Sequence, residues 1–289
     1  MRRGYTLIEI IITVAITGIL SVGMFKAFEA VTQQSEKAKI LSTLSIDSQS
    51  ALDQISSLLY HRVPLSVSGY DVGDPSRTPL ALSVDKTVIE WIGTAQESYG
   101  ALYYSGFADM NRSSRPDLYT PGTSKNGIET TQNAKWGSFD WNDTALVFSG
   151  SFDEGTPDYH PVSMGVDDTI TFTDTPPDTI YEKYQLVDSA YAVTRGEHID
   201  QSAPCIAALG LTPQTLDNTL LLFYGYRPWK GESFCADIPN GSGKVAILSA
   251  GVNAFRARML NGTIRLSIDM NRTLRGSNPI RLSKQKVVF

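Results

Sequence analysis

The pattern of apolar positions begins with a long uncharged run that a single acid interrupts. After Arg2, Arg3 and Gly4, the residues from Tyr5 to Phe25 carry no charge except at Glu9. A run of roughly 21 residues is about as long as a helix that crosses a bilayer core. We therefore expect a membrane segment over residues 5–25, in which the carboxylate of Glu9 needs a partner.

Helical periodicity continues beyond this run. Apolar residues recur at intervals compatible with 3.6 residues per turn at Phe28, Val31, Ala38, Leu41, Leu44, Ala51, Leu52, Ile55, Leu58 and Leu59. Pro64 disfavours helix at the residue before it, so the helix should stop near this point. The pattern predicts one helix over residues 5–62, roughly 85 Å long, whose second half is amphipathic and needs a sheet to pack on.

The character of the chain changes at about Leu65. From there, Gly, Pro, Asp and Ser separate short β-rich runs, which predicts a β-rich globular domain over residues 65–289. The fold class is therefore α+β, with the helix packed on a mainly antiparallel sheet. The expected strands lie within 87–93, 101–107, 144–152, 168–173, 191–194 and 219–226, and the stretches 109–143 and 153–168 are expected to be extended loops.

The sharpest local signal is a hairpin near the C-terminus. Asn261 and Gly262 can supply the two positive φ angles of a type I′ turn. This register makes Met259 face Ile264, Ala257 face Leu266 and Phe255 face Ile268, all on a core face. On the other face Arg258 lies opposite Arg265, which is unfavourable unless an acidic group covers the pair. Residues 284–289 are expected to add one more strand.

Composition supports a packed protein, and its charge is unevenly distributed. The 289 residues are 42% hydrophobic and 10% aromatic, which is ample for a core and excludes a disordered chain. The formal charge is −5, but residues 244–289 hold nine Lys and Arg and one acid, so they carry +8 and the rest −13. Packing of a basic sheet against acidic loops, in the same chain or a neighbour, explains this as well as nucleic acid does, and we predict no direct nucleic-acid contact.

The flanks of the apolar run indicate its orientation. Arg2 and Arg3 precede the run, so the positive-inside rule places the N-terminus in the cytoplasm and the residues after Lys26 on the far side. No small-x-small cleavage pattern follows the run, as a secretory signal peptide would require. The plausible processing point therefore lies in front of the run.

Gly4 followed by Tyr-Thr-Leu-Ile-Glu resembles the type IV prepilin signal, which is shared by pilins and by the pseudopilins of type II secretion. The resemblance covers the first 25 to 30 residues. It implies that residues 1–4 are a leader, that a prepilin peptidase cuts after Gly4, and that Tyr5, where the family usually has phenylalanine, becomes the methylated first residue. Glu9 would align each subunit during filament assembly by pairing with a neighbour's terminal amine.

The resemblance also implies a location and partners. A pilin-like subunit is stored in the bacterial inner membrane as a single-pass protein with a periplasmic domain, and then joins a pilus or pseudopilus. Its partners are other pilins or pseudopilins and the inner-membrane assembly platform. The globular part of over 200 residues favours a minor subunit of a tip or initiation complex, and Glu9 favours J-like minor pseudopilins or their pilus counterparts. The alternative is a single-span anchored binding or enzymatic domain.

The cysteine content fits the exported location. Cys205 and Cys235 are the only cysteines of the chain, and in an oxidising periplasm we expect them to form a disulfide. Closing a loop of about 30 residues would stabilise the fold by roughly 3 to 4 kcal/mol on the chain-entropy model. Two buried free thiols are the alternative.

The sequence contains no complete motif for catalysis or for nucleotide binding. The sequence NGSGKVAI resembles the end of a phosphate loop, but Ile238 and Val245 stand where glycine and a hydroxyl residue belong. We therefore predict a structural subunit, not an enzyme, with no cofactor and no metal. Acidic loops could still hold calcium through Asp140, Asp143, Asp153, Glu154, Asp158, Asp167 and Asp168.

Five Asn-x-Ser/Thr sequons occur, at Asn111, Asn142, Asn240, Asn261 and Asn271. Three of them have an aspartate two residues earlier, which resembles the extended acceptor of bacterial N-glycosylation. Candidate glycosylation sites are therefore Asn111, Asn142 and Asn271.

Overall fold

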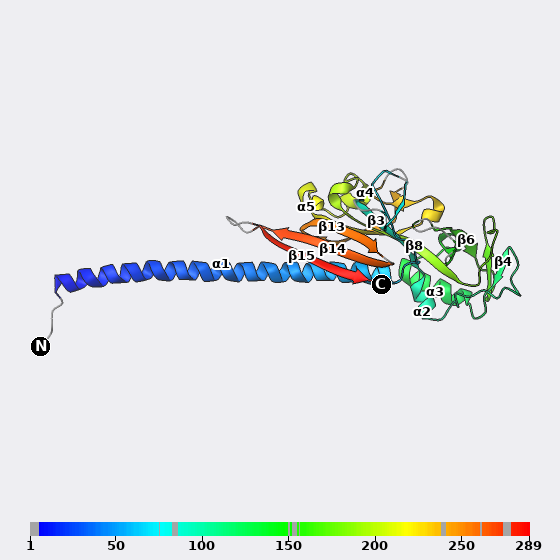
Figure 1. Ribbon diagram of the computed structural model, residues 1–289, viewed down its shortest axis with the longest axis horizontal. Coiled ribbons are helices and arrows are strands. Elements are labelled where there is room, and N and C mark those ends of the chain that lie inside the picture. The colour runs from blue at the N-terminus through cyan, green and yellow to red at the C-terminus, as the bar shows by residue number, and fades with distance from the viewer. Residues whose placement is uncertain are drawn as a thin grey trace.

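The computed structural model describes residues 6–74, 76–82, 86–149, 151, 155, 157–237, 241–260, 262–273 and 279–289. One helix, α1 (Leu7–Tyr60), projects far beyond a β-rich globular part that surrounds its C-terminal end (Figure 1). The predicted fold class is confirmed, because this helix packs against a mostly antiparallel sheet domain.

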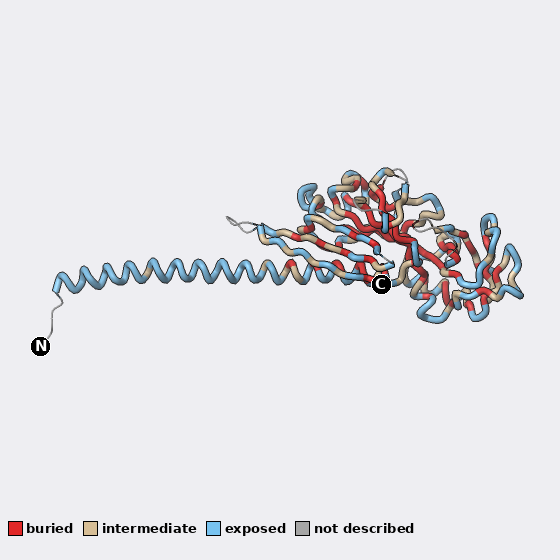
Figure 2. The backbone as a smooth tube through the Cα atoms, viewed as in Figure 1, coloured by how far each residue is buried: buried red, intermediate tan, exposed pale blue. Residues whose placement is uncertain are grey.

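Only the second half of α1 is covered by the rest of the chain (Figure 2). Its buried residues are Leu44, Ser48, Ala51, Leu52, Ile55, Ser56 and Leu59. Their spacing of three or four residues forms one stripe along the helix. The helix ends at Tyr60, and the chain then turns so that Val63 bonds to Ile92 of the sheet, which agrees with the stop predicted from Pro64.

A ten-stranded sheet forms the centre of the globular part. Along its main path the strands are β2 (Thr78–Pro79), β1 (Ser68–Tyr70), β3 (Val88–Thr94), β8 (Tyr184–Arg195), β5 (Ala145–Phe148), β6 (His160–Ser163), β7 (Thr169–Phe172) and β4 (Asp117–Tyr119). β9 (Thr219–Tyr226) pairs with the second half of β8 and with β12 (Lys244–Ala250). All of these pairings are antiparallel.

The central strands are buried on both faces. In β3, Ile89 and Trp91 join the core around α1, whereas Val88 and Ile92 join a second core on the opposite face. The second core is covered by α4 (Pro204–Ala207), α5 (Pro213–Asp217), the 3-10 turns η2 (Gly196–His198) and η3 (Pro228–Lys230), and a short parallel pair, β10 (Ser233–Phe234) and β11 (Gly241–Ser242). This double burial explains why the strand sequences are continuous apolar runs.

A separate three-stranded sheet lies along α1. It consists of β13 (Val252–Leu260), β14 (Thr263–Arg272) and β15 (Ile280–Val288), and we call it the C-terminal sheet. The predicted register is confirmed at all three core pairs, and Arg258 does face Arg265. Gly262 has φ 75°, as the turn requires, while Asn261 is outside the described residues. The terminal strand forms as predicted and is longer than expected.

The far end of the molecule is a lobe with its own core, formed by residues 95–183, which we call the distal lobe. It contains α2 (Gln96–Gly100), α3 (Lys125–Trp136), the 3-10 turn η1 (Trp141–Asp143) and the strands β4 to β7. In Figure 1, α2, α3, β4 and β6 lie at the end opposite the N-terminus.

Three sequence-based assignments in this lobe are wrong. Residues 109–143 are not a loop, because they contain β4, α3 and η1, and residues 153–168 include β6. Residues 101–107 are not a strand and form only one isolated bridge, from Phe107 to Lys183. The termini of α3 were visible in the sequence: the Ser124 side chain accepts a bond from Gly127 N–H, and Gly137 ends the helix at φ 85°.

Candidate assembly site at the start of the long helix

The N-terminal residues of the predicted processing site lie at the boundary of the described structure. Gly4 and Tyr5 are outside the described residues, which begin at Thr6. Cleavage after Gly4 and methylation of Tyr5 therefore stay predictions. The first described residues nevertheless place Glu9 in the first turn of α1, close to the position at which a mature N-terminus would lie.

The Glu9 carboxylate closes on the start of its own helix. Its Oε2 atom accepts a hydrogen bond from the Thr6 backbone N–H at 2.8 Å and another from the Thr6 hydroxyl at 2.9 Å. Thr6 has ψ 147° and occupies the N-cap position. A carboxylate at this end of a helix satisfies an orphan donor and interacts favourably with the helix dipole.

This capping contact was missed in the sequence, although the signal for it was present. Thr6-x-x-Glu9 has the spacing of a capping box, in which the residue at the third helical position reaches back to the cap. The contact uses one carboxylate oxygen. Among the described residues, the other oxygen of Glu9 accepts no hydrogen bond, and a carboxylate has lone pairs for several donors. One Glu9 side chain can therefore cap its helix and still bind a cation from another chain.

The segment that follows has the properties of a membrane helix. α1 is long and apolar enough to cross a membrane, and its apolar window is not buried within the chain. The hydroxyls of Thr13, Thr17 and Ser21 donate to backbone carbonyls four residues earlier, so they present no unpaired donor to lipid. At Gly18 and Gly23 an added Cβ would meet nothing within 4 Å in this chain, which leaves both positions open to a neighbouring helix.

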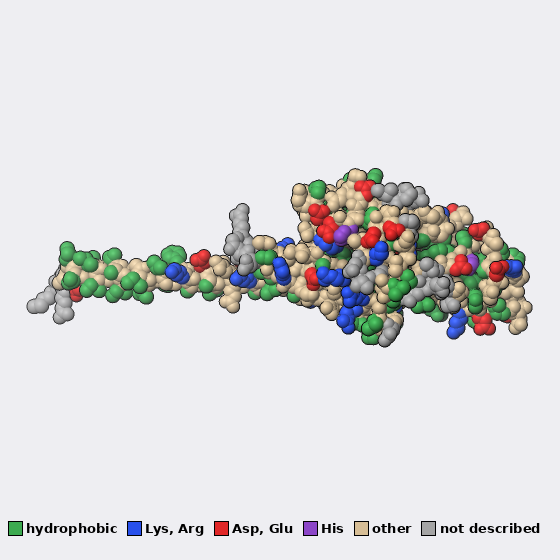
Figure 3. All heavy atoms as spheres, turned by 45° about the horizontal axis from the view of Figure 1, so that its top comes forward, with side chains coloured by type: hydrophobic (Ala, Val, Ile, Leu, Met, Phe, Trp, Pro, Cys, Tyr) green, Lys and Arg blue, Asp and Glu red, His purple; other side chains and the backbone are tan. Residues whose placement is uncertain are grey.

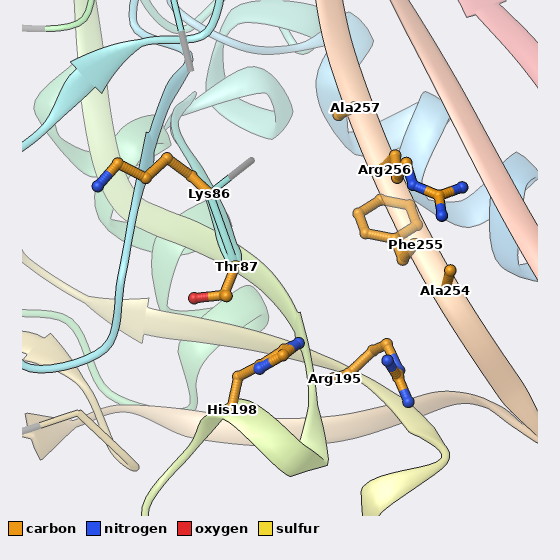
Figure 4. A pocket seen from close by; sticks show the side chains of 8 residues that line it. All are labelled: Lys86, Thr87, Arg195, His198, Ala254, Phe255, Arg256 and Ala257. Atoms are coloured by element: carbon orange, nitrogen blue, oxygen red, sulfur yellow. The ribbon is translucent and has the colours of Figure 1, made fainter. Parts of the chain in front are cut away.

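The pocket beside β13 is lined by basic side chains that are engaged in ion pairs. The pocket in Figure 4 has a volume of about 250 Å³ and lies between β13 and the region of Thr87 and η2. Its basic side chains are already paired. Lys86 contacts Asp71 at 2.8 Å, Arg195 and His198 share Glu197, and Arg256 contacts Asp269 at 3.0 Å. The pocket is therefore a gap between β13 and the region of Thr87 and η2, and its basic side chains are neutralised by neighbouring acids.

The described acids among those considered for calcium do not form a metal-binding group. Among the described residues, no group of three or more His, Cys, Asp or Glu side chains is placed to hold a metal. Asp143 pairs with Arg227 and Lys230. Asp168 caps the backbone N–H groups of Gly122 and Thr123. Asp153 and Glu154 lie outside the described residues, and calcium binding by these loops stays untested.

The cysteines are joined in the structure. Cys205 in α4 and Cys235 after β10 form a disulfide with a Cα–Cα distance of 6.4 Å. Both side chains pack against the core on the sheet face opposite α1. The bond ties α4 to the segment before β11, so it belongs to the fold and not to the assembly site.

The aspartates of two sequons have a structural explanation. The Asp109 side chain accepts a bond from the Asn111 backbone N–H at 3.0 Å, and Asp140 does the same for Asn142. Such Asx turns favour aspartate at this spacing without any glycan. Asn271 lies in β14 and its amide donates to Asn253. Asn240 and Asn261 are outside the described residues, and glycosylation stays a prediction.

Comparison with protein-family models finds one match, at the N-terminus. Residues 1–25 match the prokaryotic N-terminal methylation motif. The chain carries the type IV pilin and pseudopilin signal. The match includes Gly4, Tyr5 and Glu9 and ends where the apolar run ends. No curated protein and no solved structure matches the chain. The motif and the exposed apolar helix together describe a membrane-anchored, pilin-like protein.

Proposed function

We propose that this chain is a minor pilin or pseudopilin, a structural subunit that is stored in the bacterial inner membrane. It then joins a short filament or tip complex of a type IV pilus or a type II secretion system. The observation that carries the proposal is the N-terminal methylation motif, which runs into a helix whose first half is exposed in the described structure. A subunit of a helical filament needs such an uncovered helix, because neighbouring copies supply its packing.

The size of the globular part supports the minor class. Over 200 residues follow α1, and they include the ten-stranded sheet, the distal lobe and the C-terminal sheet. So large a head is bulky for a densely repeated shaft subunit, whereas a subunit present in few copies can accommodate it. The expected topology has the N-terminus in the cytoplasm and the head in the periplasm, in keeping with Arg2 and Arg3 before the span. The expected partners are other filament subunits, the assembly platform and the prepilin peptidase.

The role proposed for Glu9 is to pair with the methylated amine of a neighbouring subunit. Glu9→Ala should leave insertion and cleavage intact and sharply reduce incorporation, because the neighbour's ammonium would lose its partner in a low-dielectric environment. Glu9→Gln is the decisive variant. Its amide oxygen can still accept the Thr6 N–H bond, but it carries no charge. If capping were the whole role of the side chain, Glu9→Gln would assemble normally.

Incorporation is measured by crosslinking each variant to the other filament subunits in membranes, alongside a processing check on a gel. Thr6→Ala serves as the matched control, since it removes the hydroxyl donor to Glu9 and keeps the carboxylate. We expect Thr6→Ala to assemble, whereas Glu9→Ala and Glu9→Gln do not. Wild-type incorporation of Glu9→Ala would contradict the proposed role.

The processing step is tested independently. The mature mass should correspond to loss of Met1 to Gly4 and gain of one methyl group. Gly4→Ala should leave the chain inserted but mostly uncleaved and unable to assemble, because a β-carbon obstructs the close backbone access that glycine gives. Normal cleavage of Gly4→Ala would remove the prepilin interpretation and favour the alternative, an anchored binding or enzymatic domain.

A further inference from the structure

The outer face of the C-terminal sheet is basic. In β14, the side chains of Ile264, Leu266, Ile268 and Met270 are buried in the core around α1, so alternate positions point away from the helix. The register groups the outward arginines of the three strands on one surface: Arg256 and Arg258 in β13, Arg265 in β14 and Arg281 in β15. In Figure 3 blue side chains gather over the part of the molecule where this sheet lies.

Much of the positive charge on this surface has no acidic partner among the described residues. Asp269 is the only acid in residues 244–289, and Arg256 already pairs with it at 3.0 Å. Arg258 and Arg265 lie directly opposite each other and are exposed. Within the described part of the chain, neither guanidinium has an ion-pair or hydrogen-bond partner. Like charges at directly opposed positions destabilise a sheet, so the pair is better explained by an acidic group that another molecule supplies.

The distal lobe has the opposite charge. Residues 95–183 contain five basic and fourteen acidic residues, a formal charge of −9. The lobe's basic residues are largely engaged: Arg115 pairs with Asp178, Lys125 with Glu129, and Lys135 with Glu97 and Asp188. Exposed acids such as Asp174 and Glu182 have no basic partner among the described residues. Asp143 is neutralised by Arg227 and Lys230 from outside the lobe, but Asp174 and Glu182 are available to another molecule.

The two charged regions occupy different positions along the long axis. The C-terminal sheet lies beside the second half of α1, whereas the distal lobe lies beyond the end of that helix (Figure 1). A second copy with a parallel helix, displaced along the axis toward the helix N-terminus, would bring its distal lobe level with the sheet of the first copy. Such a contact joins two different surfaces, so it is heterologous, and two neighbouring copies are enough to form it.

We propose that the basic outer face of the C-terminal sheet binds the acidic distal lobe of a second copy of this chain. Arg258 and Arg265 lie at the centre of the contact. This contact rests on the proposed function in one respect: the filament supplies the parallel, staggered arrangement of the copies. It names a contact between the heads that is separate from the pairing of Glu9.

The test uses the full-length chain in detergent micelles. Two copies with different affinity tags are co-expressed, and the fraction of one that co-purifies with the other is measured at low and at high salt. We expect co-purification to fall at high salt, since exposed charges are screened. Arg258→Glu with Arg265→Glu should reduce it at least tenfold at low salt. Arg258→Gln with Arg265→Gln should also reduce co-purification. Because this double variant removes the like-charge pair, the reduction could not be attributed to electrostatic destabilisation of the sheet.

Charge exchange makes the test specific. Asp174→Lys with Glu182→Lys should reduce co-purification in the same way, and combining these changes with the two Arg→Glu substitutions should restore it. The matched control is Arg115→Glu with Lys183→Glu, which changes the net charge as much as the Arg→Glu pair but within the distal lobe. We expect no reduction for the control.

Several results would overturn the inference. Wild-type co-purification of the Arg258→Glu, Arg265→Glu chain would do so, as would loss of binding in the control. Absence of self-association, together with arginine-dependent binding to anionic vesicles or to duplex DNA, would assign the surface to lipid or nucleic acid instead. Glu9→Ala should leave this association in detergent intact. If the heads did not associate but incorporation into the filament still depended on Glu9, only the head contact would be overturned and the proposed function would stand.

Discussion

The first half of α1 and the globular part differ in what covers their apolar side chains. Leu20 is 61% exposed, whereas Leu52, nine turns further along the same helix, is 1% exposed. The apolar residues of the first half are therefore available only to lipid or to other chains. Those of the second half are covered by strands of their own chain. Substitutions in the first half should alter insertion and assembly, and substitutions in the globular part should alter stability.

The contrast can be measured in one protein, because the tryptophans report on only one of the two regions. All four lie in the globular part, at Trp91, Trp136, Trp141 and Trp229. Denaturant unfolding of the full chain in detergent, followed by tryptophan fluorescence, therefore monitors the globular part alone. Each prediction below pairs a substitution there with a matched substitution elsewhere.

The largest effect is expected at a buried ion pair. Lys135 in α3 contacts Asp188 of β8 at 2.8 Å, and the side chains are 16% and 3% exposed. Lys135→Met would leave the Asp188 carboxylate buried without its cation, which typically costs about 3–5 kcal/mol of unfolding free energy. Lys37→Met, on the exposed half of α1, should leave unfolding unchanged. An equal loss for both variants would remove the distinction between the two regions.

The same variant has a pH signature. Burial raises the pKa of the Asp188 carboxyl above its ordinary value, and Lys135 opposes that rise. Without Lys135 the folded-state pKa rises further above the unfolded value, so the stability deficit is fully developed at high pH and shrinks as the pH falls. We expect a smaller difference from wild type at pH 5 than at pH 8. A pH-independent deficit would indicate lost packing and not an unpaired charge.

The next effect compares the same substitution at two places on one helix. Leu52→Ala should destabilise the globular part by about 3 kcal/mol, through lost burial and the cavity that remains. Leu20→Ala removes the same atoms from a side chain with no intramolecular cover, so the unfolding midpoint should not move. If Leu20→Ala did shift the midpoint, the first half of α1 would have contacts to the head that one copy does not show.

A glycine pair gives a smaller effect. Gly262 in the β13–β14 turn has φ 75°, and a Cβ there would touch nothing within 4 Å, so the cost of alanine comes from the backbone alone. Gly262→Ala should destabilise by about 1 kcal/mol. Gly18→Ala lies in helical backbone, where alanine is intrinsically favoured, and should not reduce stability. It should instead weaken assembly if neighbouring helices approach closely at Gly18.

How well the sequence predicted the fold depends on how local the signals were. The C-terminal hairpin could be placed to the residue, because a two-residue turn fixes the register and a strict alternation fixes the face. The helix of residues 7–60 was also predicted well, because its apolar periodicity and the proline that follows its end, Pro64, are both local signals. The distal lobe was misread because its elements are short and its core is assembled from many of them. Tyr104, for example, is buried beside Tyr184, which is eighty positions away.

The assembly site was predictable only in part. The motif around Gly4 and Glu9 is a contiguous string, so it could be recognised without any structure. The capping bond from Thr6 has a local signal, the Thr-x-x-Glu spacing, but the same carboxylate lies in an apolar run where an intermolecular cation is also a suitable partner. The opposition of Arg258 and Arg265 was predicted from the register. Which of the described acids pair with them, in contrast, depends on how the other loops fold, which no local pattern determines.

The smallest predicted effect lies at the border between the two regions, where the C-terminal sheet is held to α1. Lys286 of β15 forms an ion pair with Asp53, and Lys284 donates to the Ser45 carbonyl at 2.8 Å. The hydrogen bond from Lys286 holds the pKa of Asp53 below its ordinary value of 3.8. A group whose folded-state pKa is depressed contributes its stability above the unfolded pKa and loses it as the pH falls through the folded-state pKa.

Asp53→Asn should therefore lower the unfolding midpoint slightly at pH 7. The difference from wild type should vanish in acid, and it should also shrink at high salt because the ion pair is exposed. Asp47→Asn is the control and should change nothing, because Asp47 lies six residues earlier on α1, is exposed and has no ion-pair partner among the described residues. If the Asp53→Asn deficit persisted below the folded-state pKa, the loss would not come from the ion pair with Lys286, and this pair would not help to hold the sheet to α1.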